Sequence, residues 1–403
     1  MRKVLLCNLD LLRINFVEYG ETQNQETKII RNEFLYILDT FLQQKKVEVI
    51  FYSKDLRQLG KAEGYFKEKG KDYKFASREQ VNQLLQNEAK SDHVIISGKD
   101  VDLQLAVRSR VLLVVPSWIP LEEKAEYYGI IVDTPTQLFK FLQVLNNHNS
   151  WYSQTQIDDH TWALSLMDAR YKYYASNASE REMMLNFEVL LKQGKSRNYF
   201  KVLLYHFLAG ITNTDFFDDI ELFGMIPSSD CSLNPDMFEF MQQVRYIKGR
   251  RLPHNHMICD NLLIRRIPKE KAHETSGYVR MQTGPEAEFD TLCINPEFAQ
   301  KISNLKSKRR FTVCVFDDYM TYGNSFNAVR NLLNHLGADK IVFVSLGTFV
   351  KPFEKWDYEI HGNVFKEGYS YRLINKSQIH HVFTPAAKEE VAALYSIYND
   401  NNI

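Results

Sequence analysis

Two acids and a hydroxyl-rich turn stand next to each other in VFDDYMTYGNSF, residues 315–326. Asp317 and Asp318 are carboxylates that could accept hydrogen bonds from the hydroxyl groups of a sugar. Residues 321–325, TYGNS, offer consecutive backbone amides, hydroxyl side chains and a glycine that permits close approach, and this combination suits a phosphate. Because a carboxylate repels phosphate but accepts hydroxyl groups well, the stretch predicts a site for a phosphorylated sugar.

The elements around this stretch place it where parallel sheets bind ligands. The apolar run FTVCVF, residues 311–316, predicts a buried strand before the acids. Helical spacing follows on one face, at Phe326, Val329, Leu332, Leu333 and Leu336. Between such a strand and helix, loop amides and the helix dipole favour an anion. The stretch lacks the lysine and the spacing of a Walker loop, so we do not expect that kind of phosphate site.

The sequence TVCVFDDYMTYGNSF resembles the phosphoribosyl-pyrophosphate signature of the type I phosphoribosyltransferases. The resemblance implies that Asp317 and Asp318 are the catalytic acids, which contact the 2′ and 3′ hydroxyls of the ribose. It also implies that the 5′-phosphate binds at Thr321, Tyr322, Gly323, Asn324 and Ser325. Tyr322 departs from the family pattern, because a small residue is more usual there and a ring would narrow the pocket.

A second loop, in GMIPSSD, residues 224–230, follows another predicted strand. It is similar to the pyrophosphate-binding loop of the same family, most closely in its competence-protein-F-like branch. The positions that match are Ser228, Ser229 and Asp230.

A basic region lies between the two loops. Residues 245–280 carry nine Lys or Arg against three acids, and in a neutral protein this excess predicts a polyanionic partner. Phosphoribosyl pyrophosphate with its Mg²⁺ would qualify. The part LIRRIPKEKAHETSGYVR resembles the mobile region that closes over pyrophosphate in the family. By this resemblance the pyrophosphate-binding residues are Arg265, Arg266, Lys269 and Lys271.

Structural alternatives stay open at each motif. The acids could be solvated residues at a strand end, before a helix whose N-cap is Asn324 or Ser325. The proline–serine turn could be purely structural, and the basic run could be a solvated face or a nucleic-acid patch. His254, His256 and Asp260 could be drawn as a metal site, but without a further ligand we predict none. The cofactor that we expect is Mg²⁺ carried by the substrate.

The first part of the chain alternates apolar runs with amphipathic stretches, which predicts a parallel α/β sheet. The fragments CNLDLL, IFYSKD and SGKDVDLQLA resemble three motifs of the haloacid-dehalogenase-like phosphatases. Asn8 stands where that family has its aspartate nucleophile, and only Asp10 of the acid pair is present. An amide cannot form an aspartyl-phosphate, and Lys99 replaces an expected acid. Ser53, in the second fragment, belongs to the same degenerate site by this resemblance. A degenerate phosphatase is therefore expected, and a non-catalytic Rossmann-like domain is the alternative.

The expected fold is α/β, with two Rossmann-like parallel-sheet domains joined by a helical segment. At 403 residues the chain is too long for one ordinary domain. Residues 1–147 would form the haloacid-dehalogenase-like domain, residues 148–213 the helical segment and residues 214–403 the phosphoribosyltransferase-like domain.

Composition adds further expectations. The 50 basic and 50 acidic side chains cancel, so net charge indicates no nucleic-acid partner. The five cysteines have no paired spacing, and no signal-peptide core or membrane span is visible, so we expect a cytoplasmic protein. A protein partner or a homo-oligomer could form through the N-terminal domain.

Together these features predict a phosphoribosyltransferase that binds phosphoribosyl pyrophosphate and Mg²⁺ and transfers ribose 5-phosphate to an unidentified nitrogen acceptor. Two other functions stay open: a non-catalytic sensor of phosphoribosyl pyrophosphate or a nucleotide, and a nucleotide-modifying effector, or toxin, of a stress or defence system.

Overall fold

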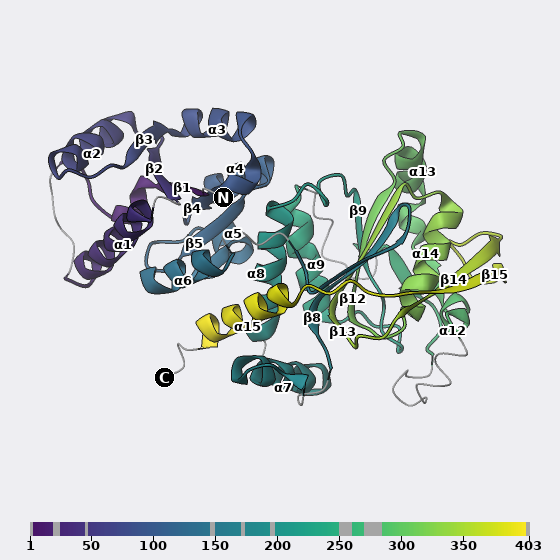
Figure 1. Cartoon of the computed structure of the whole chain (residues 1–403). Helices are drawn as coiled ribbons and strands as arrows, with labels where there is room; N and C mark the ends of the chain where they lie inside the picture. The colour runs from purple at the N-terminus through teal and green to yellow at the C-terminus, as the bar shows by residue number, and fades with distance from the viewer. Residues whose placement is uncertain are drawn as a thin grey trace.

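The computed structural model, shown in Figure 1, confirms the α/β class and contains two large sheets, each with helices packed on it. The structure describes residues 3–18, 25–44, 47–145, 150–170, 174–193, 198–249, 260–269 and 284–399. Among these residues, no helix is long and apolar enough to cross a membrane.

The N-terminal sheet has six strands, all parallel, in the order β3-β2-β1-β4-β5-β6. The strands are β1 (Lys3–Asn8), β2 (Val47–Ser53), β3 (Lys74–Ser77), β4 (His93–Ile96), β5 (Leu112–Pro116) and β6 (Ile130–Val132). The helices are η1 (Leu9–Leu12), α1 (Gln25–Gln43), α2 (Leu56–Glu68), α3 (Arg78–Asn87), η2 (Lys90–Asp92), α4 (Asp100–Ser109), α5 (Glu123–Tyr128) and α6 (Pro135–Leu145). The strand order reverses between β1 and β4, and ligands of such sheets bind at this switch point.

The second sheet has five strands in the order β7-β8-β13-β12-β9, with β7 antiparallel to β8 and the others parallel. The strands are β7 (Ser153–Asp158), β8 (Thr161–Asp168), β9 (Leu222–Met225), β12 (Thr312–Met320) and β13 (Lys340–Thr348). Its helices are α7 (Ala178–Gln193), α8 (Asn198–Thr212), α9 (Pro235–Ile247), η4 (Pro296–Phe298), α13 (Ala299–Ser307), α14 (Asn324–Leu336) and α15 (Pro385–Asn399).

Two small antiparallel sheets and a short helix lie beside the second sheet. One sheet pairs β10 (Leu263–Arg265) with β11 (Leu292–Ile294), and the other pairs β14 (Phe353–His361) with β15 (Ser370–Ile379). The short helix is α12 (Glu286–Phe289). These elements lie near α14 at the far side of the molecule from the N-terminal sheet (Figure 1).

Residues 148–213 differ from the expected helical segment, because the hairpin β7–β8 comes before α7 and α8. In β7 the side chains of Ser153, Thr155 and Ile157 are buried, while Gln154 and Gln156 are exposed. This alternation with period two is typical of an edge strand with one wet face. Its polar half makes the segment look like a loop in the sequence, although it completes the second sheet.

One hydrophobic core joins the two sheets. Helices α8, α9 and α15 lie between them in Figure 1, and the large core includes side chains from both domains. Phe316 on β12 contacts Phe207 and Phe240, with ring centroids 6.0 and 5.7 Å away. A second core covers the other face of the sheet, where Phe326 of α14 stacks on Phe343 at 4.5 Å. The N-terminal domain is thus packed onto the second domain rather than merely linked to it.

Polar contacts reinforce this interface. Asp218 pairs with Lys90 and, at 3.0 Å, with Arg110 of the N-terminal domain, and with Lys248 at 2.5 Å. Burial acts to raise the pKa of Asp218, but Lys248 and Lys90 outweigh it and lower the pKa to about 2. Tyr398 donates a hydrogen bond of 2.8 Å to the carbonyl of Ile131. We call the group of Asp218, Lys90, Arg110 and Lys248 the interdomain clamp.

Candidate functional site

Strand β12 carries both acids within its pairing rather than after it. Asp317 lies opposite Ser345 of β13, so the strand is longer than the apolar run 311–316 that predicts it. Both acids are half-buried. Burial, and then the neighbouring carboxylate of Asp318, raise the pKa of Asp317 well above its usual value. Burial likewise raises the pKa of Asp318. Two adjacent acids at a sheet end are therefore poised to gain from a ligand that donates hydrogen bonds to them or brings positive charge.

The turn after β12 depends on Gly323. Its φ of +78° lies in the left-handed region, and a Cβ there would lie 2.2 Å from the ring of Phe353. The amide of Glu354 donates to the carbonyl of Tyr322 at 3.0 Å, which fastens the turn to the start of β14. Gly323 is also the N-cap of α14, so neither Asn324 nor Ser325 has the N-cap role that the structural alternative gave them. The turn thus brings the backbone, without a capping side chain, to the positive end of α14.

Ser325 leads to a buried charged centre that the sequence did not predict. Its hydroxyl donates a hydrogen bond of 2.7 Å to Oε1 of Glu288, a residue of α12 that is 3% exposed. Arg265 pairs with Oε2 of the same carboxylate at 2.7 Å, and Lys269 pairs with Oε1. We call Arg265, Lys269, Glu288 and Ser325 the anchor cluster. Burial acts to raise the pKa of Glu288, but Lys269 and Arg265 outweigh it and hold the pKa below its usual value. The carboxylate is therefore ionised.

The anchor cluster also holds the loop after β9. The guanidinium of Arg265 donates to the carbonyl oxygens of Pro227 and Ser228, at 3.2 and 3.0 Å. The amide of Lys269 donates to the carbonyl of Ser229 at 2.9 Å. The structure thus connects the two loops with phosphate-binding resemblance, residues 224–230 and 321–325, through the same four side chains.

Other residues of the predicted site lie apart from this centre. Asp230 is exposed, and its carboxylate accepts hydrogen bonds from the amide and hydroxyl of Ser232, at 3.0 and 2.6 Å. Arg266 is exposed, and it is the first residue after β10, which ends at Arg265. Thr321 and Tyr322 are half-buried in the turn itself. The predictions on Lys271, His254 and His256 fall outside the described residues.

Asn8, the first residue of the predicted degenerate phosphatase site, lies at the switch point of the N-terminal sheet and contacts residues outside that predicted site. Asn8 donates a hydrogen bond of 2.7 Å to Asp102, which also accepts one of 2.5 Å from Ser97. Arg78 pairs with the other oxygen of Asp102 at 2.7 Å. Asp102 is fully buried. This carboxylate, absent from our predicted site, is the centre of the group.

Lys99 and Asp10 form a second ion pair at the same edge of the N-terminal sheet. Lys99 thus neutralises the remaining acid of the predicted motif. Ser53, at the end of β2, accepts a hydrogen bond of 3.1 Å from the amide of Asp55 and so serves the turn before α2. Within the described part of the chain, no group of three or more His, Cys, Asp or Glu could hold a metal ion.

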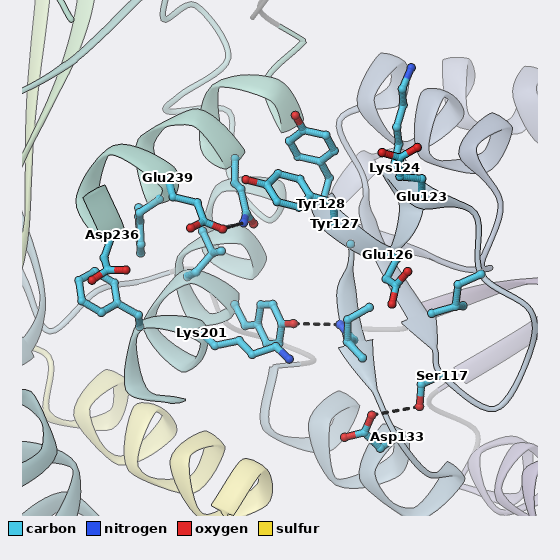
Figure 2. Close-up of a pocket in the computed structure, with 18 residues that line it drawn as sticks. Ser117, Glu123, Lys124, Glu126, Tyr127, Tyr128, Asp133, Lys201, Asp236 and Glu239 are labelled. Atoms are coloured by element: carbon cyan, nitrogen blue, oxygen red, sulfur yellow. Dashed lines mark hydrogen bonds between the residues drawn. The ribbon is translucent and has the colours of Figure 1, made fainter. Parts of the chain in front are cut away.

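A cavity of about 1150 Å³ opens between the domains, and Figure 2 shows its lining. Carboxylates stand on both walls, Glu126 and Asp133 on the N-terminal side and Asp236 and Glu239 on α9. Ser117 donates to Asp133 at 3.0 Å. The described residues that line this cavity include none of the predicted site residues. Because carboxylates outnumber cations around it, the cavity disfavours a phosphate ligand.

Comparisons with known proteins show no family. No family model matches the chain, and no curated protein matches it. Two solved structures resemble it weakly: the "GsuK channel bound to NAD", at 9% identity, and the "GsuK Channel", at 10%. In both cases the match covers 85% of this chain and 61% of the other, with a TM-score of 0.20. The chain thus spans less than two thirds of these proteins, and likenesses at this level carry no argument about fold or function.

Proposed function

We propose that the protein is a phosphoribosyltransferase that binds phosphoribosyl pyrophosphate with Mg²⁺ and transfers ribose 5-phosphate to a nitrogen acceptor. The observation that carries this proposal is the joint anchoring of the two loops. Residues 224–230 and 321–325 lie far apart in the sequence, yet Arg265, Lys269 and Ser325 converge on one point between them. A ligand with a phosphate at each end needs two such loops at a fixed separation.

The residues divide the work of the transfer. In the reaction, the bond from C1 of the ribose to the pyrophosphate oxygen breaks and a bond from C1 to the acceptor nitrogen forms. Pyrophosphate leaves with the electron pair, and the acceptor nitrogen loses a proton to a base or to solvent. Asp317 and Asp318 would hold the ribose hydroxyls and favour the positive charge that develops on the sugar. Lys269 and the Mg²⁺ that arrives with the substrate would favour the charge on pyrophosphate.

The direct test is calorimetric titration of the protein with phosphoribosyl pyrophosphate and Mg²⁺, beside the variant with Asp317→Ala and Asp318→Ala. We expect binding to the native protein and a loss of at least tenfold in the variant, about what one or two hydrogen bonds to charged groups contribute. Absence of binding in both proteins would refute the proposed ligand.

A sensor without catalysis is the second candidate, and one observation favours it. The N-terminal domain shares a hydrophobic core with the domain that holds the proposed phosphate site. A change of structure on ligand binding in the second domain could therefore be transmitted to the first through this packing. The first domain also holds Asn8 and Lys99 where the family resemblance needs acids. Turnover separates the candidates, because a transferase consumes phosphoribosyl pyrophosphate in the presence of an acceptor and a sensor only binds it.

A further inference from the structure

Glu288 occupies the position of an anion inside the anchor cluster. Its Oε1 accepts the hydrogen bond of Ser325 and faces Lys269, while its Oε2 faces Arg265. A hydroxyl, an ammonium and a guanidinium thus converge on one carboxylate from two segments of the chain, residues 265–269 and the start of α14. These are the donor types that bind phosphate groups in proteins.

The cluster is not balanced by this carboxylate alone. Two cations face one negative charge, and Glu288 offers only two oxygens. A phosphate monoester carries a charge close to −2 and three acceptor oxygens, so it matches the same donors better.

The neighbouring acid on the same helix shows what an ordinary structural contact looks like. Glu286 is two residues before Glu288, and it accepts one hydrogen bond of 3.1 Å from the hydroxyl of Tyr358. It meets no loop with phosphate-binding resemblance. The position of Glu288 between the two loops is therefore particular to that residue and not to α12.

We infer that Glu288 is a resident anion: it holds the two loops in the arrangement that the ligand needs, and the ligand's phosphate displaces it from Ser325. The inference rests on the proposed function, and it makes Glu288 the residue that sets the affinity of the site. A carboxylate that competes for the donors weakens binding. Removal of the Glu288 charge should therefore increase the affinity for the ligand, whereas loss of a residue that contacts the ligand should decrease it.

The test is titration calorimetry with ribose 5-phosphate, on the native protein and on Glu288→Gln, Glu288→Asp and Glu286→Gln. Glu288→Gln keeps the shape of the side chain and removes its charge. We expect this variant to bind ribose 5-phosphate about tenfold more tightly, since a charge-assisted competitor is lost. Glu286→Gln is the matched control, and its affinity should equal that of the native protein.

Glu288→Asp covers the case in which the glutamine variant does not fold. It keeps a negative charge beside Arg265 and Lys269, but it is one methylene too short to hold Ser325 as well, so we expect binding tighter than native. Equal or weaker binding in the folded variants overturns the inference and leaves Glu288 as a structural ion pair. A native protein that binds phosphoribosyl pyrophosphate in that case keeps the proposed function, whereas no binding of it in any variant refutes the function itself.

Discussion

The two charged centres of this protein differ in how their charges are satisfied. One lies at the switch point of the N-terminal sheet, and the other, the anchor cluster, joins β10, α12 and α14 of the second domain. At the N-terminal switch point, Asp102 is paired with Arg78 and Asp10 with Lys99, and Asn8 and Ser97 donate hydrogen bonds to Asp102. In the second domain, Arg265 and Lys269 share the single carboxylate of Glu288. Among the described residues, each acid of the first centre has its own cation, whereas in the second centre two cations share one carboxylate.

This difference indicates that a position at the edge of a parallel sheet is not sufficient for a ligand-binding site. The carboxyl edge of a parallel sheet offers amides and a crevice in both domains. The two centres differ in their ion pairs. At the N-terminal switch point each carboxylate pairs with its own cation, whereas in the anchor cluster three donors surround the one carboxylate that we propose a ligand displaces. The following substitutions test whether the two centres differ in this way.

Loss of Arg265 should have the largest effect. Arg265→Ala leaves Glu288 buried beside one cation and frees the loop after β9, so we expect a loss of about 3–5 kcal/mol in the free energy of unfolding. Urea denaturation measures it. Arg266→Ala, at the exposed neighbouring position, is the control and should change stability by less than about 0.5 kcal/mol. Equal effects of the two substitutions would show that the anchor cluster is not a special feature of the domain.

Gly323→Ala should have the second largest effect on stability. The substitution adds a Cβ to a residue with a φ of +78° and pushes it into the ring of Phe353. We expect a loss of about 2–4 kcal/mol in unfolding free energy, from backbone strain and overpacking together, and weaker binding of phosphoribosyl pyrophosphate. Gly60→Ala in α2 is the control, because nothing lies within 4 Å of that Cβ and the helix should gain about 0.5–1 kcal/mol. A stable Gly323→Ala protein with native binding would contradict the role of the turn.

The interdomain clamp gives a pH-dependent prediction. The folded-state pKa of Asp218 is depressed to about 2, so its contribution is present above pH 4 and is lost as the pH falls from about 4 to about 2. Asp218→Asn should therefore cost about 2 kcal/mol at pH 7 and almost nothing near pH 2. Denaturation of both proteins across this range measures the difference. If the N-terminal domain has only a structural role, Asp218→Asn should bind phosphoribosyl pyrophosphate at pH 7 with the affinity of the native protein. A large loss of affinity in this variant would favour the sensor function.

We expect the smallest change in stability from a substitution at the N-terminal switch point. Asn8→Asp restores the acid of the phosphatase motif but places a carboxylate against Asp102, where Asn8 now donates a hydrogen bond of 2.7 Å. We expect a cost of about 1–2 kcal/mol at pH 7 that shrinks at pH 5, because a shared proton relieves the repulsion. Neither the native protein nor this variant should hydrolyse a generic aryl phosphate. Phosphatase activity in the native protein would show that the N-terminal domain is not degenerate.

The sequence was informative where a pattern is local. The apolar run 311–316 predicted the first part of β12, and the spacing of Phe326, Val329 and Leu332 predicted the buried face of α14. The turn between β12 and α14 was predicted as a unit, because its glycine and hydroxyl residues are contiguous. The edge strand β7 was not predicted: it alternates polar and apolar residues, and it lies within residues 148–213, for which we expected a helical segment.

The anchor cluster could not be predicted because its contacts are long-range. Glu288 is 37 residues before Ser325 and 23 after Arg265, and it lies in a four-residue helix without a distinctive pattern. Phe353, which makes Gly323 necessary, comes from β14. Arg265 ends a three-residue strand and is buried, whereas Arg266 follows the strand and is exposed, and no local pattern in the sequence separates the two. A sequence pattern can suggest that basic residues serve a site, but only packing decides which of them point into it.

Hydrogen exchange of the full chain, with and without phosphoribosyl pyrophosphate and Mg²⁺, tests whether the two loops form one ligand site. We expect the ligand to slow amide exchange in both loops together, residues 224–230 and 321–325, and to leave the segments around Asn8 and Lys99 unchanged. Protection at the N-terminal switch point instead, or in neither loop, would contradict the claim that these two loops form one site.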